Sequence, residues 1–187
     1  MNSITGKWVI DPSHTNVTFS VRHLMISKVK GSFGAFSGEA NIRENITESA
    51  VVGIVDVSTI NTSDEARDGH LRSADFFDVE NFPTMTFKTN KWDMQEGASD
   101  FVLTGELTIK DVTHPVSFVG EFGGIQADGY GNTKAGLELT TKINRTDFGL
   151  TWNSTLETGG LLVGEEVTIV IDAQAVLVKE ELEPGVA

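Results

Sequence analysis

Four histidines, His14, His23, His70 and His114, are the side chains of this sequence best suited to acid–base chemistry or metal binding. No two of them lie four residues apart on a predicted helix, so the spacing gives no metal-binding pair. Asp11 lies three residues before His14 and could orient it as a base, but no nucleophile is indicated, and hydrolase, phosphate-loop and dinucleotide motifs are absent. We predict no catalytic residue and no metal site, and expect His14 and His114 to form hydrogen bonds at turns and strand edges.

Basic side chains gather at three places in the sequence, namely Arg22 with His23, Arg67 with His70 and Arg72, and Arg145. In an acidic chain, cations beside apolar strands could hold an anionic or polar headgroup. The alternative is local, because Asp64 and Asp68 stand close enough in sequence to Arg67 and Arg72 for helical ion pairs. Such pairs stabilise a helix by about 0.2–0.5 kcal/mol each and need no ligand. Both interpretations stay open from the sequence.

The chain has 187 residues, with 14 Lys and Arg against 27 Asp and Glu, which gives a formal net charge of −13. This charge disfavours nucleic acids and anionic membrane surfaces as main partners, because both repel a net anion. The absence of cysteine excludes disulfides, thiolate catalysis and thiolate-bound metals. No apolar run approaches the roughly 18 residues of a membrane-spanning helix. The first residues lack a secretory signal pattern, so we expect a cytoplasmic protein.

Alternation of apolar and polar residues dominates the sequence and predicts about eight half-buried strands. The clearest segments are residues 17–22, 51–57, 84–88, 103–109, 112–118, 137–140 and 167–172. Thr62, followed three residues later by Glu65, is a capping-box pattern, which predicts a short helix from Thr62 to about Ala74. Leu71 and Ala74 are expected on its packing side. A nearly all-β chain with one helix indicates a single antiparallel barrel or sandwich.

Turn-forming and polar residues between and after the predicted strands indicate a hairpin, a loop and a tail. Lys110 and Asp111 stand between two strand patterns and predict a tight hairpin, in which Asp111 would accept left-handed backbone. Residues 123–132 are rich in glycine and predict a long flexible loop. We expect a single domain over residues 1–178 and a frayed polar tail over residues 179–187.

Eight short sequence blocks, each occurring once, are distributed along the chain. They are WVIDPSHT (8–15), FSVRHLM (19–25), VKGSF (29–33), RDGHLRSADFFD (67–78), FPTMTF (82–87), GELTIK (105–110), THPV (113–116) and NRTDFGL (144–150). Together these blocks resemble the YceI-like family over about residues 7–178. The turn after Lys110 departs from the family pattern, because relatives often have glycine where this chain has Asp111.

The resemblance implies an all-β fold, an extended lipocalin-like barrel of eight antiparallel strands with one short helix. It implies that the barrel interior binds a long polyisoprenoid chain, such as a prenyl quinone or a prenyl phosphate, with no other cofactor. It also implies a homodimer. Eight strands leave an interior that is either packed solid or able to hold one slim ligand, and the composition does not choose between these.

Alternation gives each strand two faces but does not say which face looks inward. With that choice open, the candidates for lining the interior are Phe19, Val21, Phe33, Phe36, Phe87 and Phe118. The candidates for contacting a headgroup at the mouth are Arg22, His23, His70 and Arg72.

The main hypothesis is non-enzymatic binding, storage or transport of a polyisoprenoid lipid. One alternative is an enzyme that acts on an isoprenoid-like substrate in the barrel. Another is a structural or regulatory module whose interior is filled by its own side chains and binds no lipid.

Overall fold

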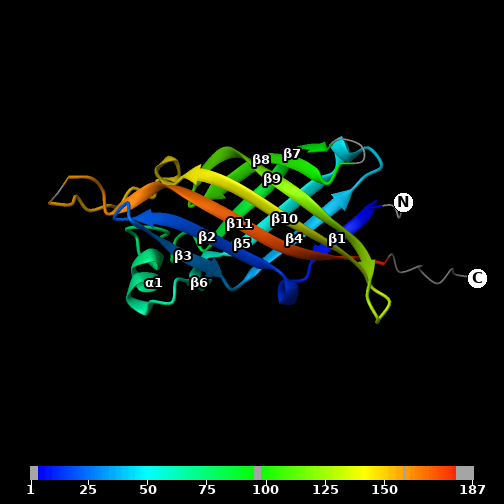
Figure 1. Cartoon of the computed structure of the whole chain (residues 1–187), viewed down its shortest axis with the longest axis horizontal. Coiled ribbons are helices and arrows are strands. Elements are labelled where there is room, and N and C mark those ends of the chain that lie inside the picture. The colour runs from blue at the N-terminus through cyan, green and yellow to red at the C-terminus, as the bar shows by residue number, and fades with distance from the viewer. Residues whose placement is uncertain (1–3, 95–97, 158, 180–187) are drawn as a thin grey trace, which may run out of the picture.

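The computed structural model describes residues 4–94, 98–157 and 159–179, which form one antiparallel sheet and one α-helix (Figure 1). The helix, α1, spans Glu65–Arg72 and lies beside one end of the sheet. In chain order the strands are β1 (Gly6–Ile10), β2 (Asn16–His23), β3 (Ser27–Phe33), β4 (Phe36–Ile42), β5 (Ala50–Asp56), β6 (Ile60–Asn61), β7 (Thr84–Met94), β8 (Asp100–Ile109), β9 (Val112–Ala127), β10 (Thr133–Asn144) and β11 (Val163–Leu177).

The sheet closes into a barrel of eight strands. Its pairing order runs β1-β4-β5-β7-β8-β9-β10-β11, and β11 pairs with β1 to complete the ring. The other three strands follow bends in the chain. The short turn Pro12–His14 separates β1 from β2, and both of these strands pair with β11. In the same way β3 precedes β4, and β6 follows β5 to pair with β3. The predicted all-β, lipocalin-like barrel of eight antiparallel strands is confirmed.

The predicted alternation is clearest in β8. Leu103, Leu107 and Ile109 are 2 %, 6 % and 3 % exposed, whereas Thr104, Glu106 and Thr108 are more exposed. On the outer face, Thr104 Oγ1 lies 2.8 Å from Ser117 Oγ of β9. Each fully buried side chain of this kind contributes about 1.5–3 kcal/mol, so the period-two pattern selects which face points into the barrel.

Close contact between β2 and β3 fixes one aromatic ring in the interior. Phe19 and Gly31 are cross-strand partners, and a Cβ atom at residue 31 would lie 2.4 Å from the Phe19 ring. Only glycine leaves room for the ring there. The ring of Phe19 also packs on that of Phe33, with centroids 5.6 Å apart.

The predicted helix exists, but its boundaries differ. Its N-cap is Asp64, whose Oδ1 accepts a hydrogen bond from the backbone N–H of Arg67 at 3.0 Å. Thr62 is not the cap, because its hydroxyl and its backbone N–H both donate to Asp68. The helix ends at Arg72, so Ala74 lies beyond it and is exposed, while Leu71 packs on the core as expected.

Two of the connection predictions can be compared with the structure. The hairpin at Lys110 and Asp111 is confirmed by the pairing of Ile109 with Val112, although the left-handed residue is Lys110, with φ of 58°. The long loop over residues 123–132 is wrong, because β9 continues to Ala127 and only residues 128–132 form a turn. A register shift beside Gly124 and Gly136 lets the two strands bend there while staying paired.

The tail predicted over residues 179–187 lies outside the described residues except for Lys179. In the part of the chain that the structure describes, no helix is long and apolar enough to cross a membrane. The cytoplasmic location stays a prediction.

Candidate functional site

The barrel interior contains an apolar cavity of about 320 Å³. Its wall extends from Trp8 and Ile42 near one end of the barrel to Leu150 and Val163 near the other, and strands from all around the ring contribute to it. Apolar side chains make up nearly all of the wall. Such a surface recognises a ligand through shape and the hydrophobic effect rather than through many polar contacts.

All six residues predicted to line the interior do line the cavity, and they are Phe19, Val21, Phe33, Phe36, Phe87 and Phe118. Phe87 of β7 and Phe118 of β9 meet edge to face, with centroids 5.0 Å apart. Phe33 and Phe118 are buried, whereas the other four are only partly covered by the protein. The structure therefore settles which strand face looks inward, and contact of these side chains with a lipid stays a prediction.

The four predicted headgroup residues lie outside the cavity wall, in two groups (Arg22 and His23 at the end of β2, and His70 and Arg72 on α1). Arg72 donates to the carbonyl oxygens of Ser58 at 2.9 Å and Ile60 at 3.1 Å, which ties α1 to the chain between β5 and β6. Its ion-pair partner is Glu65 at 3.5 Å rather than Asp68. The local interpretation thus accounts for the guanidinium of Arg72.

The basic residues near Arg72 and at the end of β2 differ in whether their side chains have hydrogen-bond or ion-pair partners. His70 Nε2 lies 2.8 Å from the Asp75 carboxylate, and its ring meets Trp152 edge to face at 4.7 Å. Arg67 pairs with Asp64 at 3.9 Å, as expected for neighbours on a helix. Arg22 is exposed on the outer face of β2. A headgroup role for the four residues stays a prediction.

Arg145 is a buried cation in the cavity wall, with 4 % of its surface exposed. Its Nε donates to the Gly164 carbonyl at 2.8 Å, one terminal nitrogen donates to the carbonyls of Leu150 and Trp152, and the other donates to Val163 at 3.3 Å. Burial lowers the pKa of this guanidinium, and nearby Glu165 opposes that effect.

These bonds fasten the chain after β10 to the start of β11 at one end of the barrel. Sequence reasoning singled out Arg145 as basic but assigned it no place in the site. Its isolation is the available signal, since it is the only basic residue between Lys142 and Lys179.

Trp92 of β7 is a second polar feature of the wall that sequence reasoning missed. Its indole Nε1 is buried and has no hydrogen-bond partner among the described residues. The ring stacks on Phe101, with centroids 5.4 Å apart and an interplanar angle of 29°. A buried N–H group without an acceptor is unfavourable, so this indole is a polar group of a wall residue whose hydrogen bond the described part of the chain leaves unmade. No sequence pattern indicates this, because it depends on what surrounds the ring.

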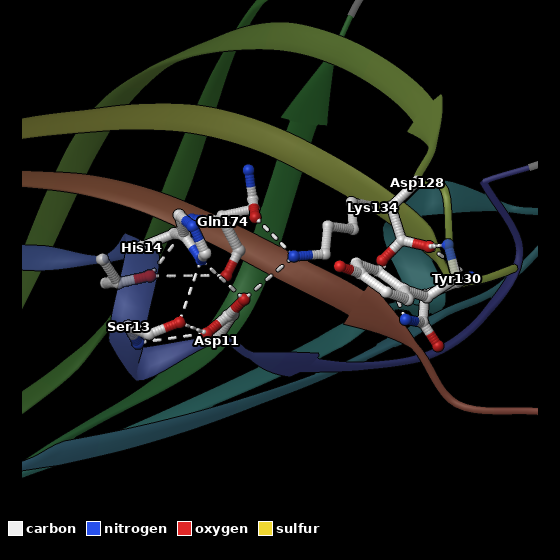
Figure 2. Close-up of polar contacts among 9 residues, drawn as sticks. Asp11, Ser13, His14, Asp128, Tyr130, Lys134 and Gln174 are labelled. Carbon is white, nitrogen blue, oxygen red and sulfur yellow. Dashed lines mark hydrogen bonds and ion pairs between the residues drawn. The ribbon is translucent and has the colours of Figure 1, made fainter.

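A polar cluster on the outside of the barrel contains Asp11, Ser13 and His14 (Figure 2). Asp11 Oδ1 accepts from the Ser13 hydroxyl at 2.5 Å, and Asp11 Oδ2 lies 2.9 Å from His14 Nδ1. Ser13 Oγ approaches the same ring nitrogen at 2.9 Å. A catalytic relay needs the hydroxyl and the carboxylate on opposite nitrogens of the imidazole, so this geometry is that of a capped turn.

The same cluster fastens the turn after β1 to the neighbouring strands. Lys134 of β10 donates to Asp11 at 3.2 Å and to the side chain of Gln174 of β11 at 3.0 Å (Figure 2). Hydrogen bonds from Ser13 and then from His14, with a further contribution from Lys134, hold the pKa of the Asp11 carboxyl well below its usual range. Neither Asp11 nor His14 belongs to the cavity wall.

His114 and Asp128 also have structural partners. His114 Nε2 lies 3.0 Å from the Asp147 carbonyl oxygen, which agrees with the expected hydrogen bond at a strand edge. Asp128 closes the β9–β10 turn by accepting from Asn132 and from the backbone N–H of Tyr130 (Figure 2). These bonds, led by the Asn132 side chain, lower the pKa of the Asp128 carboxyl. Among the described residues, no group of three acidic or histidine side chains is arranged to hold a metal ion.

Comparison with known proteins places this barrel in a family. The sequence profile of the YceI-like domain matches residues 8–175. The chain belongs to the YceI-like family. A UPF0312 protein from Staphylococcus aureus is 38 % identical to this chain over 170 residues, which cover 89 % of this chain and 95 % of that protein.

Solved structures carry the same fold. The YceI protein of Campylobacter jejuni is 30 % identical, with a TM-score of 0.71, and the match covers 96 % of this YceI-like chain and all of that one. BcnA of Burkholderia cenocepacia has a TM-score of 0.76 at 19 % identity, covering 88 % of this chain and 98 % of BcnA. A polyisoprenoid-binding domain of Saccharophagus degradans has a TM-score of 0.69 at 13 % identity, covering 91 % and 98 %. At such low identity, the last two similarities establish the fold alone.

Proposed function

We propose that this YceI-like protein binds one polyisoprenoid lipid in the barrel cavity and serves as its store or carrier without changing it chemically. The continuous apolar wall of the cavity carries the proposal. Burying an apolar chain against such a wall contributes about 25 cal/mol per Å² of apolar surface. The cost of ordering a flexible chain offsets part of this gain. The structural neighbour from Saccharophagus degradans, described as a polyisoprenoid-binding domain, supports the same ligand class.

The size of the cavity favours a slim ligand. About 320 Å³ is near the lower limit of the roughly 300–1,000 Å³ typical of small-molecule sites. A linear chain of isoprene units fits such a space better than a fused ring system, because it can follow the barrel axis. A long polyprenyl chain would need the partly covered aromatic side chains of the wall, such as Phe19 and Phe87, to change rotamer.

The polar groups of the wall distinguish two kinds of headgroup. The unpaired Nε1–H of Trp92 is a neutral donor, which suits the carbonyl oxygen of a prenyl quinone once the ring turns to bring this buried atom to the cavity. A prenyl phosphate carries charge that needs cations, and the guanidinium of Arg145 is already bonded to four carbonyl groups. A phosphate would therefore lie outside, at the barrel end where Arg22, His23, His70 and Arg72 are found.

The enzymatic alternative has less support. The cluster of Asp11, Ser13 and His14 is exposed and lies outside the cavity wall, so a lipid in the barrel would not meet it. The alternative of a barrel filled by its own side chains is disfavoured by the cavity itself.

Extraction of the purified protein with denaturing organic solvent, followed by mass spectrometry, tests the proposal. We expect one class of isoprenoid lipid, intact and in a fixed ratio to protein. Protein from which no lipid is extracted, and which no prenyl compound stabilises against heat, would contradict lipid binding. Recovery of a chemically altered lipid after incubation with a pure prenyl compound would support the enzyme instead.

A further inference from the structure

The turn between β2 and β3 exposes large apolar side chains at one end of the barrel. Met25 is 65 % exposed and Ile26 is 82 % exposed, and within the described ranges they are the only two consecutive large apolar residues with such exposure. We call residues 24–26 the hairpin tip. Soluble proteins seldom expose adjacent apolar side chains at a protruding turn unless that turn makes contact with something.

The backbone of the hairpin tip is unusual for the residues it holds. Leu24 and Met25 have positive φ angles of 52° and 60°, in a turn closed by the Ile26 N–H donating to the His23 carbonyl at 3.2 Å. Asn and Gly are the residues normally found at such positions in hairpins. The sequence keeps large apolar residues where the backbone disfavours them, and the fold does not use the side chains of Met25 and Ile26 in its core.

A cationic surface adjoins the hairpin tip. Arg22, Lys28 and Lys30 are exposed and have the same strand parity on β2 and β3, and we call them the cationic face. Arg22 and Lys28 are direct cross-strand partners, an arrangement of like charges that is unfavourable by itself. None of the three forms an ion pair with any residue that the structure describes.

The sequence around the hairpin has no counter-charge. No acidic residue occurs between Asp11 and Glu39, although the chain has 27 of them. On the neighbouring strand β11, Glu166 is already paired with Lys142 at 2.9 Å, which leaves Glu165 as the acid nearest in register to Arg22. The hairpin is thus a local cationic surface on a protein with net charge −13.

We propose that the hairpin tip docks this protein on anionic lipid bilayers, with the cationic face against lipid phosphates. Apolar side chains at the boundary between headgroups and acyl chains, with basic side chains beside them, are the combination that binds peripheral proteins to membranes. The net charge of the protein repels such a surface at long range. At contact, screening over about 8 Å leaves the nearest charges, those of the hairpin, in control.

The hairpin tip lies close to the cavity. Val21, two residues before the end of β2, lines the wall, and so does Val163, the cross-strand partner of His23. The Leu24 N–H donates to the Leu162 carbonyl at 2.8 Å, which places Leu161, itself 40 % exposed, next to the tip. Entry of a membrane lipid at this end rests on the proposed function, whereas docking itself does not.

A cysteine-free chain allows a direct test. We would replace Ile26 with cysteine, attach an environment-sensitive dye, and add vesicles of equal parts phosphatidylglycerol and phosphatidylcholine. The matched control is Tyr130→Cys, since Tyr130 is 93 % exposed in the β9–β10 turn, at the opposite end of the barrel. We expect a blue shift of the dye at residue 26 only, and none with pure phosphatidylcholine. An unchanged dye at residue 26, or an equal shift at residue 130, would overturn the proposal.

Co-sedimentation of the unlabelled protein with the same vesicles tests the cationic face. We expect Lys28→Ser and Lys30→Ser each to weaken binding about fivefold, and Lys91→Ser, on β7, to leave it unchanged. Equal binding to vesicles without phosphatidylglycerol would overturn the role of the cationic face. Protein that sediments with anionic vesicles but contains no extractable lipid would support docking and contradict the cavity proposal, so the two can fail separately. Binding to neither vesicle would overturn the docking proposal.

Discussion

The Asp68 carboxylate of α1 accepts two hydrogen bonds from Thr62, one from its backbone N–H at 2.8 Å and one from its hydroxyl at 2.5 Å. Both residues are buried, at 4 % and 6 % exposed. Arg67 completes the arrangement by donating from Nε to the Thr62 hydroxyl oxygen at 2.7 Å. The segment before the helix is therefore fixed by a residue of the helix interior, and not by a capping box.

We predict that Thr62→Ala destabilises the protein by about 1–3 kcal/mol, because it leaves the buried Asp68 carboxylate with one hydrogen bond fewer. The free energy of unfolding from urea denaturation measures this effect. The matched variant is Thr62→Ser, which keeps the hydroxyl and should cost clearly less.

The N-cap provides a separate comparison for the same helix. Asp64→Ala should cost about 1 kcal/mol, which is typical of a lost helix cap. If Thr62→Ala were harmless and Asp64→Ala were not, the buried pair would have no energetic role.

We predict that Val21→Trp lowers the amount of lipid bound, because the larger side chain would occupy the cavity beside the end of β2. Overpacking could also cost about 1–3 kcal/mol, so the thermal unfolding of the variant must be measured together with its lipid content. The control is Val119→Trp, since Val119 is 63 % exposed on the outside of β9. A folded Val21→Trp protein with the lipid content of the wild type would show that Val21 does not contact the ligand.

The unpaired donor in the wall gives a prediction about ligand chemistry. Trp92→Phe keeps an aromatic ring and removes the buried Nε1–H. We expect about fivefold to tenfold weaker binding of a prenyl quinone, corresponding to about 1–1.5 kcal/mol for one hydrogen bond. Binding of a hydrocarbon such as squalene should not weaken. Equal losses for both ligands, measured by fluorescence titration, would mean that the ring and not its N–H is what matters.

The hydrogen bonds around Asp11 predict a dependence of stability on pH. Because the pKa of this carboxyl is lowered in the folded state, its ionised form stabilises the protein fully above the ordinary aspartate pKa of about 4. That contribution is lost as the pH falls below this value towards the folded-state pKa. The difference in unfolding free energy between wild type and Asp11→Asn should be constant near neutral pH and shrink in acid. A carboxyl carbon of Asp11 that titrates at the ordinary value in NMR spectra would contradict this.

Family resemblance predicts a homodimer, and light scattering should give twice the chain mass of 20.2 kDa. The net charge of −13 on each chain opposes association. Added salt should therefore tighten the dimer, because it screens this repulsion. A mass of one chain over a wide concentration range would remove the prediction.

Much of the fold could be predicted from period-two patterns, because one face of each strand is buried and the residue types record it. The six residues predicted to line the interior all line the cavity, although alternation alone leaves open which face of each strand looks inward. The predicted helix start is wrong because Thr62 and Glu65 have the spacing of a capping box. The partner of Thr62 is Asp68, which reaches it only once α1 folds against the preceding segment.

The polar part of the site was harder to predict. The sequence identifies Arg22 and Arg72 as cations close to apolar strand segments. It does not show that Arg22 points outward or that Arg72 donates to backbone carbonyls. The missing partner of Trp92 and the burial of Arg145 depend on residues distant in the chain. Such features require the three-dimensional arrangement.

The central place of β11 in the sheet has a consequence for how the protein folds. This strand pairs with β10 but also with β1 and β2, and the Thr18 hydroxyl donates to the Val170 carbonyl across 152 positions of sequence. Contacts between residues so far apart in sequence form slowly, because closing the intervening loop costs chain entropy before the contact stabilises the protein. During synthesis, β1 and β2 cannot pair with β11 until that last strand has left the ribosome. The barrel therefore closes late, when β11 pairs with β1, and a lipid can be enclosed only during that closure or after it.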